Sequence, residues 1–449
     1  MTQPLTPLDY NQPDRLLTLV DEALYHAERQ GASAAATSIG ANEGLSVSVR
    51  MGSVETIEHH RSKQLGISVY FGQKTGSATT TDLDVPAVRN AVEAACRIAC
   101  YTQDDEYAGL ADADRMATEQ PDLDLYHPWE LTPEEATTIA LEIENAARQH
   151  DSRITNSDGA GVNCFQGCHV YGNSHGFRGS YAGTRHSASC AVIAEADGEM
   201  QRDYWHSVAR RAEGLEASAD IGVEAASRTI KRLGARRLST RTVPVMFSPE
   251  TARRLFGSLL SAINGASLYR KASFLLDSLG EQIFSDIVSI RDEPHIKGGL
   301  GSSSFDYEGV ATEPRDLVRD GVLQSYVLDS YAGRRLGMPS TGHAGGVHNL
   351  IVEPGELSFD ELLRTMDTGL LITELMGMGV NILTGDYSRG VAGFWVENGE
   401  LQYPVEEITA ASNLRDMFLG VRAIGNDVDY RSSLKTGSLL LEKMTIAGE

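Results

Sequence analysis

Two early stretches of the chain alternate between hydrophobic and polar residues, which is the pattern of a β-strand with one buried face. They are residues 45–51 (LSVSVRM) and residues 65–71 (LGISVYF). Apolar residues at helical spacing precede them between about Pro13 and Gln30 and follow them from about Asp84. The pattern therefore predicts a helix, two strands and a second helix in this order.

The next third of the chain also has clear helix and strand signals. Thr132, Pro133 and Glu135 have the spacing of a capping box with proline at the first helical position, so a helix is expected to begin there. Residues 153–210 are strand-like, with turns predicted at 157–159 and at Asp197-Gly198. A further helix is expected over about residues 219–233.

The C-terminal half combines helices and strands in mixed order. A helix is expected after Ser248, and Ser358 with Glu361 forms a second capping box. Asp320-Gly321 and Asn398-Gly399 each lie between strand-like runs, as in β-hairpins.

The order of these elements predicts an α+β fold. It has an N-terminal α/β sandwich-like half and a β-rich C-terminal half with mixed, largely antiparallel sheets. We expect three domains: an N-terminal α/β domain (1–125), a central strand-rich domain (126–238) and a C-terminal β-rich domain (239–449). The first boundary falls in a loop rich in Asp, Ala and Gly, and the second precedes the strand-like run VPVMF.

Composition narrows the classes of partner. Lys and Arg number 39 and Asp and Glu 62, so the formal net charge is −23, which disfavours direct contact with nucleic acid or anionic membranes. No apolar run is long enough to span a bilayer, and residues 1–14 lack the pattern of a signal peptide. The five cysteines do not form a disulfide pattern, so a reducing cytoplasm is the expected location.

Two motifs have a catalytic interpretation and a structural one. Ser174 lies in Gly-Asn-Ser-His-Gly, which matches the nucleophile elbow of serine hydrolases, but the residues after it predict a strand where the elbow needs a helix. A hairpin turn is the favoured interpretation. Cys164, Cys168 and His169 are close in sequence but fit no standard zinc spacing, so burial in the core is favoured.

Two glycine-containing loops carry the candidate binding residues. His343 and His348 lie in TGHAGGVHN, where they could bind metal, bind substrate carbonyls or line a turn; no third ligand is evident. Asp386 and Arg389 lie in TGDYSRG, where they could contact a ligand or pair with each other.

A metallopeptidase motif is absent from the sequence. None of the twelve histidines is followed by glutamate, so the helical His-Glu arrangement that supplies zinc ligands and a general base is missing. No cysteine follows Cys190, so the C-terminal half offers no thiolate ligand. We therefore assign no catalytic residue and no metal ligand.

Long strings of the sequence resemble the TldE/PmbA branch of the TldD/PmbA family (peptidase family U62). They are SASCAVIAEADGEMQRDY from Ser187, YRKASFLLDSLGEQI from Tyr269, STGHAGGVHN from Ser340, and TELMGMGVNILTGDYSRGVAGFWVENGELQYPVEEIT from Thr373. Shorter strings from Pro121, Arg153 and Val170 agree, so the resemblance extends over nearly the whole chain.

The resemblance implies a two-subunit zinc metalloprotease that admits unfolded or extended peptides to an internal cavity. In relatives this two-subunit protease is linked to the maturation of a peptide antibiotic and to the degradation of an antitoxin. The TldD-type subunit binds zinc through an HExxxH helix, a further histidine and a cysteine. In this chain Phe256, Gly257 and Ser261 stand in the HExxxH positions, and residues 434–437 stand near the cysteine.

The expected function is therefore a non-catalytic partner subunit. We expect no cofactor in this chain and zinc in the TldD-type partner. The candidates for lining the peptide tunnel are His343, His348, Asp386 and Arg389. A homodimer in the absence of the partner stays open. The alternatives are an independent homodimeric hydrolase, using Ser174 or an unrecognised metal cluster, and a protein-binding regulator such as a gyrase modulator.

Overall fold

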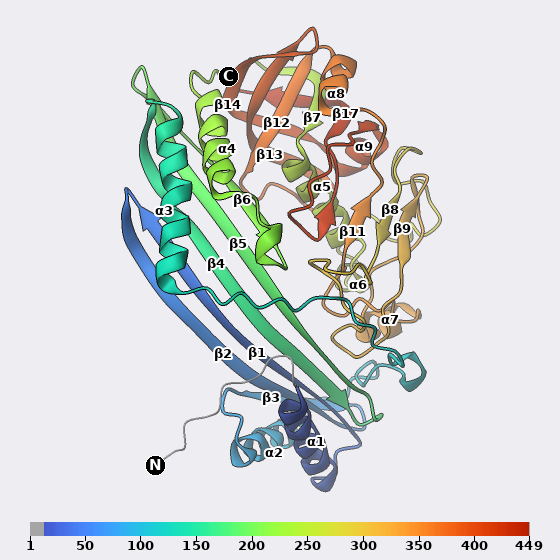
Figure 1. Ribbon diagram of the computed structural model, residues 1–449. Helices are drawn as coiled ribbons and strands as arrows, with labels where there is room; N and C mark the ends of the chain where they lie inside the picture. The colour runs from blue at the N-terminus through green and yellow to red at the C-terminus, as the bar shows by residue number, and fades with distance from the viewer. Residues whose placement is uncertain (1–12, 449) are drawn as a thin grey trace.

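A computed structural model describes residues 13–448, and its first part is one long antiparallel sheet (Figure 1). The strand order is β3-β2-β1-β4-β5-β6. The strands are β1 (Ala34–Arg50), β2 (Ser53–Phe71), β3 (Lys74–Thr80), β4 (Ile154–Asn173), β5 (Arg178–Ala196) and β6 (Glu199–Ala209). Because β1 pairs with β4 along most of its length, strands from both sides of residue 125 share one sheet.

Four helices cover one face of this sheet. They are α1 (Asp14–Arg29), α2 (Val85–Tyr101), α3 (Pro133–His150) and α4 (Ser218–Lys231). Alternate residues of β1 are buried: Ile39 packs in the core beneath α1 and α2, and Val47 in the core beneath α3 and α4. The predicted helices and the capping box at Thr132 are confirmed.

Three local expectations for this half need correction. The turn predicted at residues 157–159 is a break in register inside β4, with Gly159 at a φ of 115°, so the strand bends but continues. The two strands predicted as short runs are 17 and 19 residues long. The four-residue spacing of Cys96 and Cys100 on one helix face predicts that both lie in the core, but only Cys96 is buried and Cys100 is exposed on α2.

The C-terminal part contains a closed ring of strands. In order around the ring these are β14 (Glu400–Asn413), β13 (Asp386–Glu397), β12 (Gly369–Met376), β7 (Arg241–Phe247) and β17 (Leu439–Ala447), with β15 (Val421–Ile424) beside β17. Pairing of β17 with β14 closes the ring. The hairpin predicted at Asn398-Gly399 is confirmed.

A second, smaller sheet adjoins this barrel. Its order is β10 (Val322–Leu323), β9 (Arg315–Arg319), β8 (Ile290–Asp292), β11 (Leu350–Val352) and β16 (Leu434–Lys435). The helices of this half are α5 (Pro249–Ala262), α6 (Gly265–Tyr269), α7 (Ser330–Leu336), α8 (Phe359–Met366) and α9 (Leu414–Leu419). Most strand pairs are antiparallel, and β7–β12 and β11–β16 are parallel. The α+β prediction is confirmed.

Aromatic residues join the two halves near the end of the long sheet. Phe305 packs edge-on against Phe177 at 5.3 Å and Tyr181 at 5.7 Å between ring centroids. Arg210 on the loop after β6 donates hydrogen bonds to the carbonyls of Gly299 and Leu300.

No helix within residues 13–448 is long and apolar enough to cross a membrane. The interpretation of residues 1–14 falls almost wholly outside the described residues.

Candidate functional site

The histidine loop, residues 340–349, connects α7 to β11 and folds over the end of β8. His343 Nε2 lies 3.1 Å from Asp292 Oδ2, and His348 Nδ1 lies 2.8 Å from the same oxygen. The backbone N–H of His348 donates to Asp292 Oδ1 at 3.0 Å. Asp292 is fully buried and the two histidines are 4% and 8% exposed. One carboxylate therefore holds both imidazoles in the protein interior.

Electrostatics favours an ionised Asp292. Burial raises the pKa of this carboxyl, but hydrogen bonds and charge from His343 and His348 outweigh it and lower the pKa to about 2. A second buried carboxylate, Asp306, accepts from the N–H of Ala344 at 2.9 Å and so holds the middle of the loop. Burial raises the pKa of Asp306.

The glycine run at 298–304 is packed against the histidine loop. Asn349 Nδ2 donates to Ser302 Oγ at 2.8 Å, and Asn349 Oδ1 accepts from the N–H of Gly301. A Cβ at Gly301 would lie 2.1 Å from the carbonyl oxygen of His348, so a side chain does not fit there. Close approach of backbone explains the glycine at this position.

Asp292, His343 and His348 are also the group within residues 13–448 whose donor atoms approach closely enough for a metal, all within 4.8 Å of one another. Two imidazoles and a carboxylate are ligands that zinc accepts. Here, however, the ligand atoms are hydrogen-bonded to each other: Asp292 Oδ2 accepts from both rings. The donor set therefore fits a metal in type, while its present geometry is that of a hydrogen-bonded triad.

The sequence points to the two histidines of this group but not to Asp292. The aspartate lies 51 residues before His343 and has no motif of its own. Only the pairing of β8 with β11, which aligns Asp292 with Leu350, brings it beside the loop. Asp292 is therefore too distant in sequence from the two histidines to be recognised as a third ligand from motif spacing.

The other two candidate residues, Asp386 and Arg389, do not pair with each other. Asp386 Oδ2 accepts from Thr384 Oγ1 at 2.6 Å, and Arg389 donates to the carbonyls of Met376 and Gly377. Both lie at the start of β13, three residues apart and so on opposite faces of the strand. The interpretation of this loop as an Asp386–Arg389 ion pair was wrong. Neither Asp386 nor Arg389 forms a hydrogen bond with the histidine loop in the described part of the chain.

Ser174 lies in the hairpin between β4 and β5, as the favoured interpretation expected. Its Oγ accepts a hydrogen bond from the N–H of Ala35 at 3.0 Å, and its own N–H donates to the Ala35 carbonyl. A strand follows the turn, so the strand–turn–helix geometry of a nucleophile elbow is absent at this position.

The cysteine group of β4 is part of the sheet. Cys168 is buried in the helix-covered core, and burial raises the pKa of its thiol to about 11. His169, the next residue, packs its ring against Tyr181 and Tyr307, and burial lowers its pKa. Adjacent residues of a strand point to opposite faces, so these two side chains do not converge.

The positions that the resemblance aligns with HExxxH lie on α5. Phe256 is fully buried and stacks on Phe284 at 6.2 Å between centroids. Gly257 has no atom within 4 Å of an added Cβ, and Ser261 donates its hydroxyl to the Gly257 carbonyl. Near the expected cysteine, Thr436 is buried and hydrogen-bonded to the carbonyl of Gly437. The first histidine position is thus occupied by core packing.

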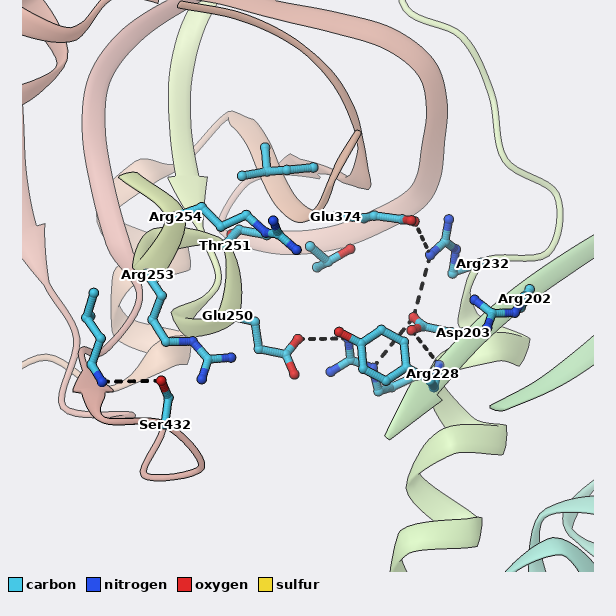
Figure 2. Close-up of a pocket in the computed structure, with 14 residues that line it drawn as sticks. Arg202, Asp203, Arg228, Arg232, Glu250, Thr251, Arg253, Arg254, Glu374 and Ser432 are labelled. Carbon is cyan, nitrogen blue, oxygen red and sulfur yellow. Dashed lines mark hydrogen bonds and ion pairs between the residues drawn. The ribbon is translucent and has the colours of Figure 1, made fainter. Parts of the chain in front are cut away.

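A cavity of about 440 Å³ opens beside the first turns of α5 (Figure 2). Residues of β6, α4 and β12 line its other sides, together with Ser432 and Leu434. Arginines project into it from two directions: Arg228 from α4 and Arg232 directly after it, and Arg253 and Arg254 from α5. The cavity is therefore strongly polar and is built where the central and C-terminal parts meet.

Comparisons with known proteins identify the class of this chain. Profiles of the PmbA/TldA metallopeptidase family match residues 37–99 (domain 1), 126–233 (central domain) and 240–448 (C-terminal domain). Metalloprotease PmbA of Escherichia coli O157:H7 is 50% identical over 415 residues, which is 92% of each chain. A PmbA homologue of Haemophilus influenzae is 48% identical over 97% of each chain. The chain belongs to the PmbA/TldD metallopeptidase family.

Within this family the chain is of the TldE/PmbA type. The fold agrees with that of a proposed modulator of DNA gyrase from Bacteroides thetaiotaomicron, with a TM-score of 0.92 and 29% identity over 97% of this chain and 99% of that one. TldE from Thermococcus kodakarensis shares the fold, with a TM-score of 0.84 and 19% identity over 96% of this chain and all of that chain.

Proposed function

We propose that this chain is the non-catalytic subunit of a cytoplasmic two-subunit metallopeptidase whose zinc is bound by a TldD-type partner. The observation that carries the proposal is on α5. A buried phenylalanine, a glycine and a serine stand where the HExxxH motif is expected, and none of them supplies an imidazole or a general-base carboxylate. A metallopeptidase lacking these groups needs them from elsewhere.

The substrates that we propose are unfolded or extended peptides, as in peptide-antibiotic maturation or antitoxin degradation. The backbone of β2 supports binding by strand addition. Within the described residues β3 pairs only with residues 65–71 of β2, so residues 53–64 have a neighbouring strand on one side alone. Such an edge binds backbone and tolerates varied side chains, which suits broad specificity.

The tunnel-lining role of His343, His348, Asp386 and Arg389 stays a proposal. His343 and His348 are buried and hydrogen-bonded, so we expect them to fix the shape of their loop. Asp386 is exposed, so it is the better candidate for direct contact with a peptide. Alanine substitutions that leave peptide turnover by the complex unchanged would remove these residues from the account.

The test is to purify this chain, its TldD-type partner and their mixture, and to measure bound zinc and cleavage of an unstructured peptide. We expect a stable complex of the two chains, with zinc carried by the partner and cleavage in the mixture. Zinc-dependent cleavage by the lone chain would overturn the proposal. A complex that forms and binds gyrase but cleaves no peptide would instead favour a regulatory role.

A second candidate function is an independent metallohydrolase, which the closeness of Asp292, His343 and His348 supports. This candidate predicts zinc bound to the lone chain and lost in His343→Ala and His348→Ala variants. The matched control is His175→Ala, at an exposed histidine of the β4–β5 turn. Zinc content that is near zero in the lone wild-type chain rejects this candidate.

A further inference from the structure

The cavity beside α5 contains an extended network of ion pairs. Arg228 donates to Glu250 at 2.9 Å, and Glu250 also accepts from Arg431 at 2.8 Å. Arg232 lies between Glu374 at 2.5 Å and Asp203 at 3.7 Å, as Figure 2 shows. The network joins α4 of the central part to α5 and to the segment before β16. It therefore fixes the walls of the cavity relative to each other.

The formal charges of this network do not cancel. The network consists of the charged residues that line the cavity and their ion-pair partners. The cations are Arg202, Arg228, Arg232, Arg253, Arg254 and Arg431. The anions are Asp158, Asp203, Glu250, Glu374 and Asp429. Six cations against five anions leave one positive charge, in a chain whose formal net charge is −23.

Arg254 is the member of the network without an anionic partner in the described part of the chain. Arg253, the preceding residue, lies 3.3 Å from Asp429, and Arg202 lies 2.5 Å from Asp158. Figure 2 shows Arg254 extending from α5 into the cavity with no interaction drawn to another residue. Arg228, in contrast, is paired on two sides: its Nε lies 3.5 Å from Asp203 Oδ2 and its Nη2 donates to Glu250.

We propose that this cavity binds one carboxylate group of an extended peptide, with Arg254 as the residue that supplies the unmatched charge. A guanidinium binds a carboxylate through two parallel hydrogen bonds. Arg254 is exposed to solvent, so a ligand carboxylate can reach it directly and salt should weaken the pair. The excess of a single charge matches a single carboxylate. The carboxylates of Asp203, Glu250 and Glu374 in the lining repel a ligand with several negative charges, such as a polyphosphate.

The size of the cavity fits this ligand. About 440 Å³ is within the usual range for small-ligand pockets of about 300–1,000 Å³ and accommodates the end of a peptide or one acidic side chain with its neighbours. That the carboxylate belongs to a peptide rests on the proposed function. The presence of a carboxylate site rests on the charges alone.

The experiment measures binding of matched peptides to the pure chain by calorimetry at low salt. The probes are an N-acetylated alanine–glycine hexapeptide with a free C-terminal carboxylate, the same peptide as its C-terminal amide, and the amide with one glutamate in its middle. We expect the free acid to bind the wild-type chain about tenfold more tightly than the amide, with salt weakening the binding. If the glutamate-containing amide binds as tightly as the free acid, and the plain amide does not, an acidic side chain also serves as a source of the carboxylate.

The variants are Arg254→Ala and Arg254→Lys, with Arg97→Ala on the outer surface of α2 as the matched control. We expect Arg254→Ala to abolish the preference for the free acid, Arg254→Lys to keep part of it, and Arg97→Ala to leave it intact. Equal affinity of all three peptides for the wild-type chain, or an unchanged preference in Arg254→Ala, would overturn the inference. Because the measurement uses this chain without a partner, it is independent of the zinc and cleavage measurements that test the proposed function.

Discussion

His348 and Asp292 are 56 residues apart in the chain, and their side chains meet at 2.8 Å in a site almost closed to solvent. Asp292→Asn keeps the shape of the side chain but removes the charge and one acceptor for the two imidazoles. We expect the free energy of unfolding to fall by about 2–4 kcal/mol, because a buried network loses the group at its centre. Urea denaturation measures this change, with the exposed Asp286→Asn as control. A loss as small as that of the control would contradict the triad.

The same carboxylate predicts a dependence of stability on pH. The pKa of Asp292 is lowered to about 2, against about 3.9 in an unfolded chain. The stabilisation is therefore complete above about pH 4 and is lost as the pH falls toward about 2. In urea titrations across this range, the difference between wild type and Asp292→Asn should narrow. A difference that stays constant to the lowest pH would argue against an ionised Asp292.

A buried carboxylate on α3 makes a second structural prediction. Glu144 is fully buried and accepts hydrogen bonds from the N–H groups of Met51 and Gly52 at 2.8 and 2.7 Å, in the turn between β1 and β2. Glu144→Ala leaves these donors unsatisfied, and we expect a loss of about 2 kcal/mol and faster hydrogen exchange around residues 48–56. Glu142→Ala, on the exposed side of the same helix, is the control. Unchanged exchange at the turn would refute the role of Glu144.

Ser174 separates the subunit proposal from the serine-hydrolase alternative. Its hydroxyl oxygen accepts from the N–H of Ala35, so Ser174→Ala should cost about 1 kcal/mol of stability and leave peptide cleavage by the complex unchanged. Cleavage rate and urea midpoint are measured on the same preparations. A fall of about 1,000-fold or more in the cleavage rate, at unchanged zinc content, would show that the serine is a nucleophile after all.

Local signals in the sequence predicted much of the fold. The capping boxes at Thr132 and Ser358 formed as expected, and the hairpins at Asp197-Gly198, Asp320-Gly321 and Asn398-Gly399 lie at the predicted turns. These features depend on residues within a few positions of each other, so their chemistry is visible in a short window of sequence.

Strand length was not predictable in the same way. In β2, residues 53–62 are exposed, so no buried face imposes alternation there and the sequence indicates only the later half of the strand. The bend at residues 157–159 carries turn residues, yet pairing with β5 on both sides keeps it within β4. Tertiary pairing determined both outcomes.

The candidate site required contacts between distant segments. The two histidines stood out because they share one loop, whereas Asp292 became visible only through the pairing of β8 with β11. The arginine-lined cavity combines residues of β6, α4, α5 and β12, which no sequence window contains. The absence of the HExxxH motif, in contrast, could be seen in the sequence alone, because the motif would occupy six consecutive residues on one helix.

The most direct test of the central claim is a titration of the TldD-type partner with this chain at constant partner concentration, following cleavage of an unstructured peptide. The account predicts cleavage that rises with added chain, levels off when the two chains are equimolar, and is absent in this chain without the partner. Cleavage by this chain alone, or a rate that is unaffected by adding it to the partner, would contradict its role as a non-catalytic subunit.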